Sequence, residues 1–375
     1  MASVENSTVP LSLSLPRKSQ PLWQQMWPLT LTWSGHLSPG DAADYDAFVD
    51  GASSGHFVQA RRWAPLARAG RPFSSSYAIV RDATARVIGS AHILRAQFAG
   101  LPLPYAVIER GPVVADPALF GPVLSRIARA ARWRGIARLA VMPYWDLTTG
   151  EAVLASLDEL GWRSVQKMSG AHAATLRLAL EPGVGAAAVA DDRDGSAALD
   201  TIFAGSEYRK LRQQYRLAER AGARARRGTV ADLPRFVALY RQLMDQQGLR
   251  AKTFSWFDAL AALDFGPDGS VGLFFTEHEA ETVAGALAIR HGRLVTLYLA
   301  ASSRAPRKYS KMVTCLVAAV AWAQRIGCDF DLGGVPMTGD TDEKRASIAQ
   351  FKREFATTRL DLIGEHARWL WGRIG

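Results

Sequence analysis

Cysteine is scarce in this chain of 375 residues, and the two that occur, Cys315 and Cys328, lie in apolar segments where buried side chains are expected. Neither belongs to a CxxC motif or stands at ligand spacing from a histidine, so neither a disulfide framework nor a zinc site is expected. The seven histidines also lack metal or relay spacing, and each is expected to be a surface or hydrogen-bonded residue. These absences favour a protein of a reducing compartment that holds no metal ion.

Long apolar runs and nucleotide-binding motifs are missing as well. No stretch of about 18 uninterrupted apolar residues occurs, so no membrane-spanning helix is expected. Residues 1–40 lack the order of a secretion signal and are expected to form a loose extension, whose Trp23, Trp27 and Trp33 could touch a membrane or a partner. No G-x-S-x-G, Walker or dinucleotide glycine pattern supports a hydrolase or a nucleotide-driven enzyme. We expect a cytoplasmic protein that could also work at the inner face of the cytoplasmic membrane.

The charge that the chain does carry is unevenly placed. The net charge is +10, and apolar residues make up 48% of the sequence, a share typical of a globular protein with a core. The segment 205–228 holds eight basic and two acidic residues, a net charge of +6. Such a local excess indicates an anionic partner.

Hydrophobic alternation and turn residues give the same order of elements twice: strand, polar turn, strand, strand, helix, glycine, strand. In the first half the expected elements are 77–81, 86–94, 105–109, 119–133 and 138–143. In the second half they are 271–276, 283–289, 294–300, 308–325 and a strand from 330. The repeat predicts an α+β fold with two related domains, each a mainly antiparallel mixed sheet flanked by helices. We place them at 41–185 and 206–375, with a linker at 186–205.

A basic helix is expected at about 206–221, opening the second domain. Four arginines recur on it at steps of three, four and four and form one stripe: Arg209, Arg212, Arg216 and Arg220. Because the planar guanidinium donates two hydrogen bonds at once, it suits phosphate. Arg212 and Arg216 are therefore candidate substrate-binding residues, and a solvated surface helix without a ligand is the alternative.

Two further motifs lie near the C-terminus. A strand from Phe330 ends in Gly333-Gly334, which lets a ligand approach the backbone, and Asp331 could orient a nucleophile there or simply cap the turn. Farther on, Phe351 and Phe355 share one helix face and leave Lys352 turned aside. A lysine in that position could stabilise the oxyanion of acyl transfer, or the segment could be an ordinary amphipathic turn.

Together these motifs resemble those of the Fem family, the GNAT-like aminoacyltransferases that build peptidoglycan bridges. In the first half the matching segments are His56-Phe57-Val58-Gln59, Trp63 and Arg110-Gly111-Pro112-Val113-Val114. In the second half they are Arg212–Gly222 on the basic helix, Asp329–Val335, and Phe351-Lys352-Arg353-Glu354-Phe355. Ala356 replaces the glycine that closes the last motif, and the family's long helical arm is absent.

The resemblance implies two tandem GNAT-like domains and attack by an acceptor amine on an aminoacyl ester, with no metal, cofactor or covalent intermediate. It implies charged tRNA as donor and a nucleotide- or lipid-linked peptidoglycan precursor as acceptor, with Arg212 near its phosphates. Lys352 would stabilise the developing charge, with Asp331 as second catalytic candidate. Further substrate-binding candidates are Arg110, Tyr298, Gly333, Gly334 and Phe351.

Two other functions stay open. A CoA-dependent GNAT enzyme would need a glycine-rich turn before the helix at 308–325, but Arg304-Ala305-Pro306-Arg307-Lys308 has no glycine and Pro306 lacks an N–H donor. The side chains of Arg307 and Lys308 could still meet phosphates. A non-catalytic RNA- or membrane-binding protein on a transferase scaffold is the other alternative, and absence of turnover would distinguish it.

Overall fold

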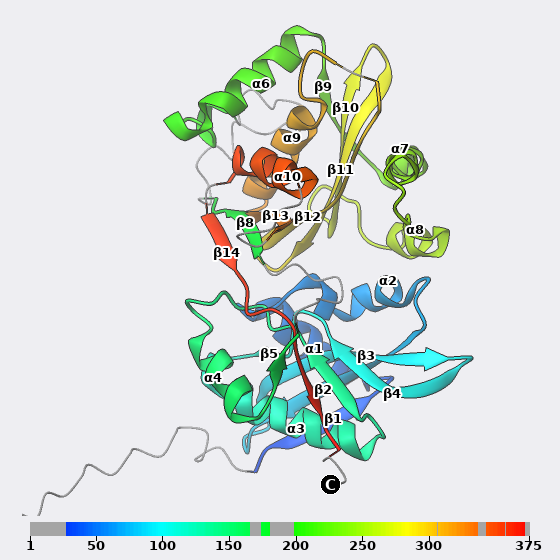
Figure 1. The fold of residues 1–375 in the computed structure, drawn as a ribbon, viewed down its shortest axis with the longest axis vertical. Helices are drawn as coiled ribbons and strands as arrows, with labels where there is room; N and C mark the ends of the chain where they lie inside the picture. The colour runs from blue at the N-terminus through cyan, green and yellow to red at the C-terminus, as the bar shows by residue number, and fades with distance from the viewer. Residues whose placement is uncertain are drawn as a thin grey trace, which may run out of the picture.

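The computed structural model describes residues 28–165, 174–180, 199–305, 307–336, 343–356 and 358–371. The chain forms two lobes, each built on its own sheet and stacked along the long axis of the molecule (Figure 1). Both sheets are mixed, mainly antiparallel and flanked by helices, so the expected α+β class is confirmed. None of the helices in the described ranges is long and apolar enough to cross a membrane.

The first sheet has the strand order β1-β2-β3-β4-β6-β15-β7, with β5 beside β3. Its strands are β1 (Thr30–Ser34), β2 (Phe73–Arg81), β3 (Val87–Phe98), β4 (Leu101–Ile108), β5 (Val113–Val114), β6 (Arg138–Val141), β7 (Arg163–Ser164) and β15 (His366–Trp369). The helices of this lobe are α1 (Pro39–Gly51), α2 (Ala64–Arg68), α3 (Phe120–Trp133) and α4 (Glu151–Glu159). Only the pair β4 and β6 is parallel.

The second sheet has the order β14-β8-β13-β12-β11-β10-β9. Its strands are β8 (Ala174–Leu178), β9 (Arg224–Gly228), β10 (Val271–His278), β11 (Glu281–His291), β12 (Leu294–Ser302), β13 (Asp329–Val335) and β14 (Thr358–Asp361). Its helices are α6 (Arg209–Arg220), α7 (Leu233–Gln246), α8 (Phe254–Ala261), α9 (Lys311–Arg325) and α10 (Glu343–Arg353). The helices α6, α9 and α10 lie on one side of the sheet, and α7 and α8 on the other (Figure 1).

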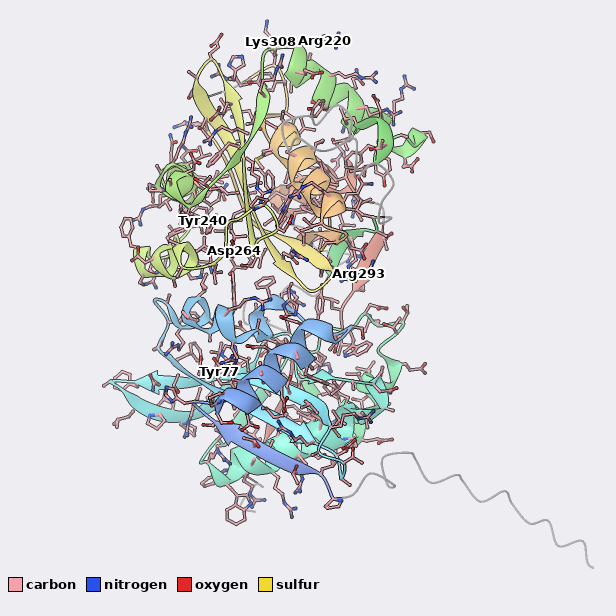
Figure 2. The ribbon with its side chains drawn as sticks, turned by 180° about the vertical axis from the view of Figure 1, so that it is seen from behind. Tyr77, Arg220, Tyr240, Asp264, Arg293 and Lys308 are labelled. Atoms are coloured by element: carbon pink, nitrogen blue, oxygen red, sulfur yellow. The ribbon has the colours of Figure 1, made fainter. Side chains whose placement is uncertain are left out.

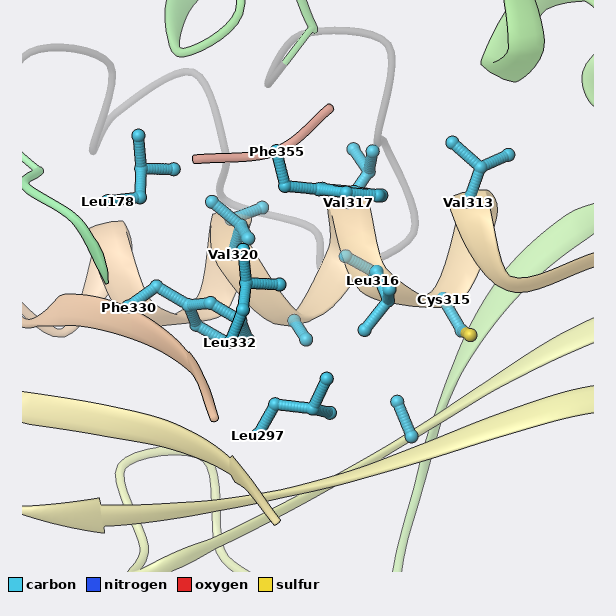
Figure 3. Packing of buried hydrophobic residues seen from close by; sticks show 14 of the residues in the cluster. Leu178, Leu297, Val313, Cys315, Leu316, Val317, Val320, Phe330, Leu332 and Phe355 are labelled. Carbon is cyan, nitrogen blue, oxygen red and sulfur yellow. The ribbon is translucent and has the colours of Figure 1, made fainter. Parts of the chain in front are cut away.

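Helix α9 forms the centre of the second core. It is apolar around most of its circumference, and twelve of its fifteen residues are buried, as expected for a helix covered on every side. Leu178, Phe330 and Phe355 pack around it from three separate elements (Figure 3). Cys315 and Cys328 are both buried and unpaired in this core, as the sequence suggested.

The expected repeat is present in both lobes. Each has three antiparallel strands, a helix, and a strand parallel to the third, namely β2-β3-β4-α3-β6 and β10-β11-β12-α9-β13. Gly135 and Gly327 end the two helices with φ of 75° and 67°, a conformation that glycine adopts without steric cost. The glycines singled out in the sequence therefore correspond to real helix ends.

The next strand in each sheet comes from the other half of the chain. β15 pairs with β6 in the first sheet, and β8 pairs with β13 in the second. Residues 174–178 thus lie in the second sheet although the first domain was expected at 41–185, and residues 366–369 lie in the first although the second was expected at 206–375. Each lobe is completed by the other half, which fastens the two lobes together.

The range expected to be a loose extension, 1–40, contains the edge strand β1. Its Trp33 donates from Nε1 to the hydroxyl of Ser76 at 3.0 Å, and the strand pairs with β2 from Thr30 to Ser34. Helix α1 then begins after Ser38, whose side chain accepts a hydrogen bond from the N–H of Asp41. Trp23, Trp27 and most of the expected linker lie outside the described residues.

The arginine-rich segment divides into two parts. On β9, Arg226 pairs with Asp232 at 2.7 Å and Glu277 at 2.8 Å, and Arg227 lies 5.3 Å above the ring of Trp322. These arginines are therefore structural. The stripe on α6 remains at the surface, while Leu211 and Tyr215 of the same helix are buried.

Candidate active site

The two lobes meet at the carboxylate of Asp331. This residue of β13 is only 2% exposed and accepts hydrogen bonds from the N–H of Gly333 at 2.6 Å and the hydroxyl of Tyr144 at 3.2 Å. The hydroxyl of Thr175 also donates to it. A buried carboxylate is tolerated only when such donors replace water. Because Tyr144 follows β6 in the first lobe and Thr175 lies on the exchanged strand β8, the crossover assembles this cluster.

Tyr144 is the centre of a second layer of contacts. Arg177 donates to its hydroxyl at 2.9 Å, and the guanidinium of Arg110 lies 5.2 Å from the centre of its ring. Burial, with the charge of Asp331 nearby, raises the pKa of Tyr144 to about 12, so the phenol remains a neutral donor. The ring of His56 is 4.7 Å away, and burial lowers the pKa of His56 well below its usual range. His56 is therefore a neutral, hydrogen-bonded histidine.

Lys352 reaches the same place from α10. Its ammonium donates to the carbonyl of Gly334 at 2.7 Å. Burial lowers the pKa of Lys352 to about 8, and the charge of Asp331 acts in the opposite direction. Phe351 and Phe355 hold the segment through ring contact at 5.4 Å, and Phe355 is fully buried. The shared face that the sequence predicted for these phenylalanines thus anchors a lysine whose charge depends on pH near neutrality.

The turn below Lys352 requires glycine. Gly333 has a φ of 73°, which favours glycine, and a Cβ at this position would lie 2.9 Å from the carbonyl oxygen of Leu297. The same Cβ would lie 3.8 Å from the ammonium of Lys352. Any larger side chain would therefore strain the backbone and crowd the approach to the lysine.

A cavity of about 240 Å³ lies between the lobes. Trp63, Trp256 and Tyr298 supply aromatic walls, and the ammonium of Lys252 lies 5.4 Å above the ring of Trp256. Burial, reinforced by the nearby charge of Arg71, lowers the pKa of Lys252. Arg71 itself pairs with Glu109 at 3.0 Å, and Arg250 also lines the cavity.

This cavity adjoins the Asp331 cluster through two pairs of neighbouring residues. On β12, Leu297 faces Gly333 and the next residue, Tyr298, lines the cavity. On the first lobe, His56 contacts Tyr144 while Phe57 meets Tyr298 with ring centres 5.5 Å apart. The cavity and the Asp331 cluster are thus built from adjacent residues of β12 and of the first lobe.

The arginine stripe of α6 borders an open depression of about 660 Å³ on the second lobe. Arg212 is partly used by the fold, because its guanidinium donates to the carbonyls of Gly205, at 2.6 Å, and Phe203. Arg216 is exposed and approaches Asp200 at 3.7 Å, and Arg220 lies at the end of the second lobe remote from the first (Figure 2). Lys210 of the same helix pairs with Glu354, two residues beyond Lys352. The helix is therefore tied to the end of α10.

The structure brings most of the sequence-selected residues together. Asp331, Gly333, Gly334 and Lys352 lie together, and Arg110 meets them through Tyr144. Phe351 packs on Phe355 beside Lys352, Tyr298 lines the adjoining cavity, and Arg212 and Arg216 lie on α6. Sequence reasoning missed Tyr144, Thr175, Arg177, Lys252 and Trp256. Tyr144 directly follows a predicted strand, and Thr175 and Arg177 alternate on β8. Neither pattern indicates that these side chains contact Asp331 or each other.

The chain is similar in sequence to one protein-family model and in fold to several solved structures. Residues 205–345 match the family model of the acetyltransferase (GNAT) domain. The crystal structure of FemX superposes with a TM-score of 0.70 and 18% identity, covering 90% of this chain and 96% of FemX. The chain has a Fem-like tandem GNAT fold. The expected fold of two tandem GNAT-like domains is therefore confirmed.

Two further structures share this fold. The C-terminal domain of a putative lysylphosphatidylglycerol synthetase from Agrobacterium fabrum has a TM-score of 0.52 at 18% identity and covers 89% of this chain and 92% of its own. A tandem GNAT protein of the clavulanic acid biosynthesis pathway has a TM-score of 0.53 at 10% identity, covering 92% and 99%. The comparison with curated proteins found no significant match.

Proposed function

We propose that this protein is an N-acyltransferase that moves an aminoacyl group from aminoacyl-tRNA to an amine of a cell-envelope precursor. The observation that carries the proposal is the ammonium of Lys352, held at 2.7 Å from the carbonyl of Gly334 beside the buried Asp331. A fixed cation at a glycine turn is suited to an ester carbonyl that acquires negative charge. FemX and a protein named for lysylphosphatidylglycerol, an aminoacylated lipid, share the fold and support this choice.

In the proposed reaction the acceptor nitrogen forms a bond to the ester carbon, and the C–O bond to the tRNA ribose then breaks. The nitrogen loses a proton and the ribose oxygen gains one. Lys352 stabilises the intermediate oxyanion. Asp331 already accepts three hydrogen bonds, so we assign it a positioning role: it fixes the Gly333 turn and favours the charged form of Lys352.

We assign the cavity between the lobes to the acceptor. Aromatic walls can stack on a planar ring, and Lys252, Arg71 and Arg250 can neutralise phosphate. This chemistry suits a nucleotide- or lipid-linked precursor. Because adjacent residues of β12 line the cavity and face Gly333, an acceptor held in the cavity would have its amine close to Lys352.

Replacing Lys252 by alanine should raise KM for such an acceptor by about tenfold, because one charge-assisted hydrogen bond to the acceptor is removed, with little change in kcat. Lys252→Arg should keep most of the affinity. Lys308→Ala serves as the matched control, because Lys308 is exposed at the end of the second lobe that is remote from the first lobe and from the cavity (Figure 2). Steady-state kinetics with a nucleotide-linked acceptor measure the effect, and an unchanged KM in Lys252→Ala would remove the acceptor from this cavity.

We assign the α6 depression to the tRNA backbone. Replacing Arg209 and Arg216 together by alanine should lower the slope of log affinity against log salt by roughly one unit for each phosphate that the helix no longer neutralises. Arg212 is less suitable for this test because it also supports the turn at Gly205. Filter binding with charged tRNA measures the slope, and Arg86→Ala with Arg163→Ala is the control pair of exposed arginines on the first lobe. A slope equal to that of the control pair would make α6 a solvated surface helix.

The donor is tested directly. The protein is incubated with an amine acceptor and either aminoacyl-tRNA or acetyl-CoA, and loss of the acyl group is followed for each donor, with Lys352→Met as the inactive reference. The turn before α9 favours RNA over CoA as donor, because it lacks the glycines that a CoA site would need. The carbonyl of Ala305 in this turn accepts a hydrogen bond from the ammonium of Lys311 at 2.8 Å. Consumption of acetyl-CoA alone would select the CoA-dependent alternative. Binding of tRNA with no transfer would select the non-catalytic one.

A further inference from the structure

Large apolar side chains are concentrated along one edge of the first lobe. They come from the β3–β4 hairpin, the end of α3 and the segment at the end of β15, and each is at least 40% exposed. The side chains are Phe98 (73%), Leu101 (70%), Leu103 (40%), Trp133 (84%), Trp369 (69%) and Trp371 (53%). We call this set the rim. It contains half of the large exposed hydrophobic side chains that the described residues show.

The three segments of the rim are hydrogen-bonded to each other. The N–H of Ala137 donates to the carbonyl of Pro104 at 2.9 Å, and the N–H of Leu370 donates to the carbonyl of Ala137 at 2.7 Å. Arg95 fastens the hairpin to the turn after α3, donating to the carbonyls of Leu103 at 2.8 Å and Arg134 at 2.9 Å. Hydrogen bonds therefore join the three segments of the rim at the end of the first sheet.

The charge of these segments has a single sign. Residues 95–104, 129–138 and 366–371 contain no aspartate or glutamate. Their arginines are Arg95, Arg129, Arg132, Arg134, Arg138 and Arg368. Asp158 and Glu159 lie outside these segments, in the last turn of α4. Exposed tryptophan and phenylalanine among arginines, without acidic residues, match the interface of an anionic bilayer, where aromatic rings lie at headgroup level.

We propose that the rim docks the protein on a bilayer that contains anionic phospholipid. Phe98 and Leu101 enter the acyl boundary from the hairpin, the tryptophans lie among the headgroups, and the exposed Arg129, Arg132 and Arg368 neutralise lipid phosphates. Docking would also orient the cavity between the lobes, because the hairpin is joined to the cavity wall. The N–H of Gln97 in the hairpin donates to the carbonyl of Pro72, and the preceding residue, Arg71, lines the cavity. A lipid-linked acceptor would then reach the cavity from the membrane, a consequence that rests on the proposed function, whereas docking itself does not.

The test is sedimentation of the full chain with vesicles of phosphatidylcholine alone, or of equal parts phosphatidylcholine and phosphatidylglycerol, without any substrate. The wild type should bind the anionic vesicles and bind the neutral ones much more weakly. Phe98→Ser with Leu101→Ser should weaken binding roughly tenfold. Arg132→Glu with Arg368→Glu should weaken binding to anionic vesicles by at least about fivefold for each arginine.

Val230→Ser, an exposed apolar position on the second lobe, is the matched control and should bind like the wild type. Lys352→Met should also bind like the wild type, which separates the rim from the catalytic site. Thermal unfolding establishes that each variant is folded. Equal binding by the wild type and the hairpin variant would overturn the proposal. Failure of the wild type to bind either kind of vesicle would also overturn it. If light scattering then shows a dimer that the hairpin substitutions dissociate, the rim contacts a second copy of the chain.

Discussion

Lys352→Ala is expected to lower kcat by about a hundredfold or more while both substrates still bind, because removal of one oxyanion donor has an effect of this size. Lys352→Arg should recover only part of the rate, since its charge is spread over a planar group that cannot occupy the same point beside Gly334. Single-turnover kinetics with charged tRNA measure the chemical step. Full activity of the alanine variant would remove Lys352 from the mechanism.

The pH dependence gives a second test of the same residue. Catalysis requires the protonated form, and burial lowers the pKa of Lys352 to about 8. The rate should therefore fall as pH rises through about 8, and the arginine variant should lose this alkaline limb because its guanidinium stays charged. A wild-type rate that is flat from pH 7 to pH 10 would contradict the assignment.

Stability separates loss of function from loss of fold. The pKa of Lys352 is depressed from 10.5, so the folded state is penalised below pH 8 and the penalty disappears as pH rises toward 10.5. Lys352→Met should remove the penalty and stabilise the protein at pH 7 by roughly 1–3 kcal/mol. Chemical denaturation at pH 7 and pH 10.5 should show a gain at the lower pH only. A folded, more stable and nearly inactive variant is the expected result.

After the substitutions of Lys352, Asp331→Asn is expected to have the largest effect, on both the stability of the protein and the pH dependence of its rate. An amide cannot accept all three hydrogen bonds that the carboxylate accepts, and leaving a buried donor unpaired should reduce stability by about 1–3 kcal/mol. The charge of Asp331 raises the pKa of Lys352, so its removal should also move the alkaline limb of the rate profile to lower pH. A role limited to packing would leave that limb in place.

Tyr144→Phe is the matched control for this substitution. It removes one hydrogen bond to Asp331 but leaves the charge of the carboxylate, so the alkaline limb should remain close to its wild-type position. If Asp331→Asn and Tyr144→Phe shift the limb equally, the effect comes from the missing hydrogen bonds and the electrostatic role of Asp331 is wrong.

The repeat of strands and helices could be predicted because its causes are local. Alternation fixes which residues of β10 and β11 face the core, and a glycine after α3 or α9 ends the helix whatever lies elsewhere. The shared face of Phe351 and Phe355 depends only on helical spacing, and so does the arginine stripe of α6. Such features depend on residues within one or two turns of each other.

Tertiary structure decided which residues share the site. Nothing within β8 or β15 specifies the sheet each will join, because any edge strand offers the same backbone donors and acceptors. Their exchange places Thr175 and Arg177 beside Asp331, and Tyr144 arrives from the other lobe. The stripe on α6 shows the same limit, since only folding reveals that Arg212 donates to Gly205 while Arg216 remains exposed. Local sequence sets periodicity and helix ends, whereas partners distant in the chain are chosen by the burial of whole surfaces.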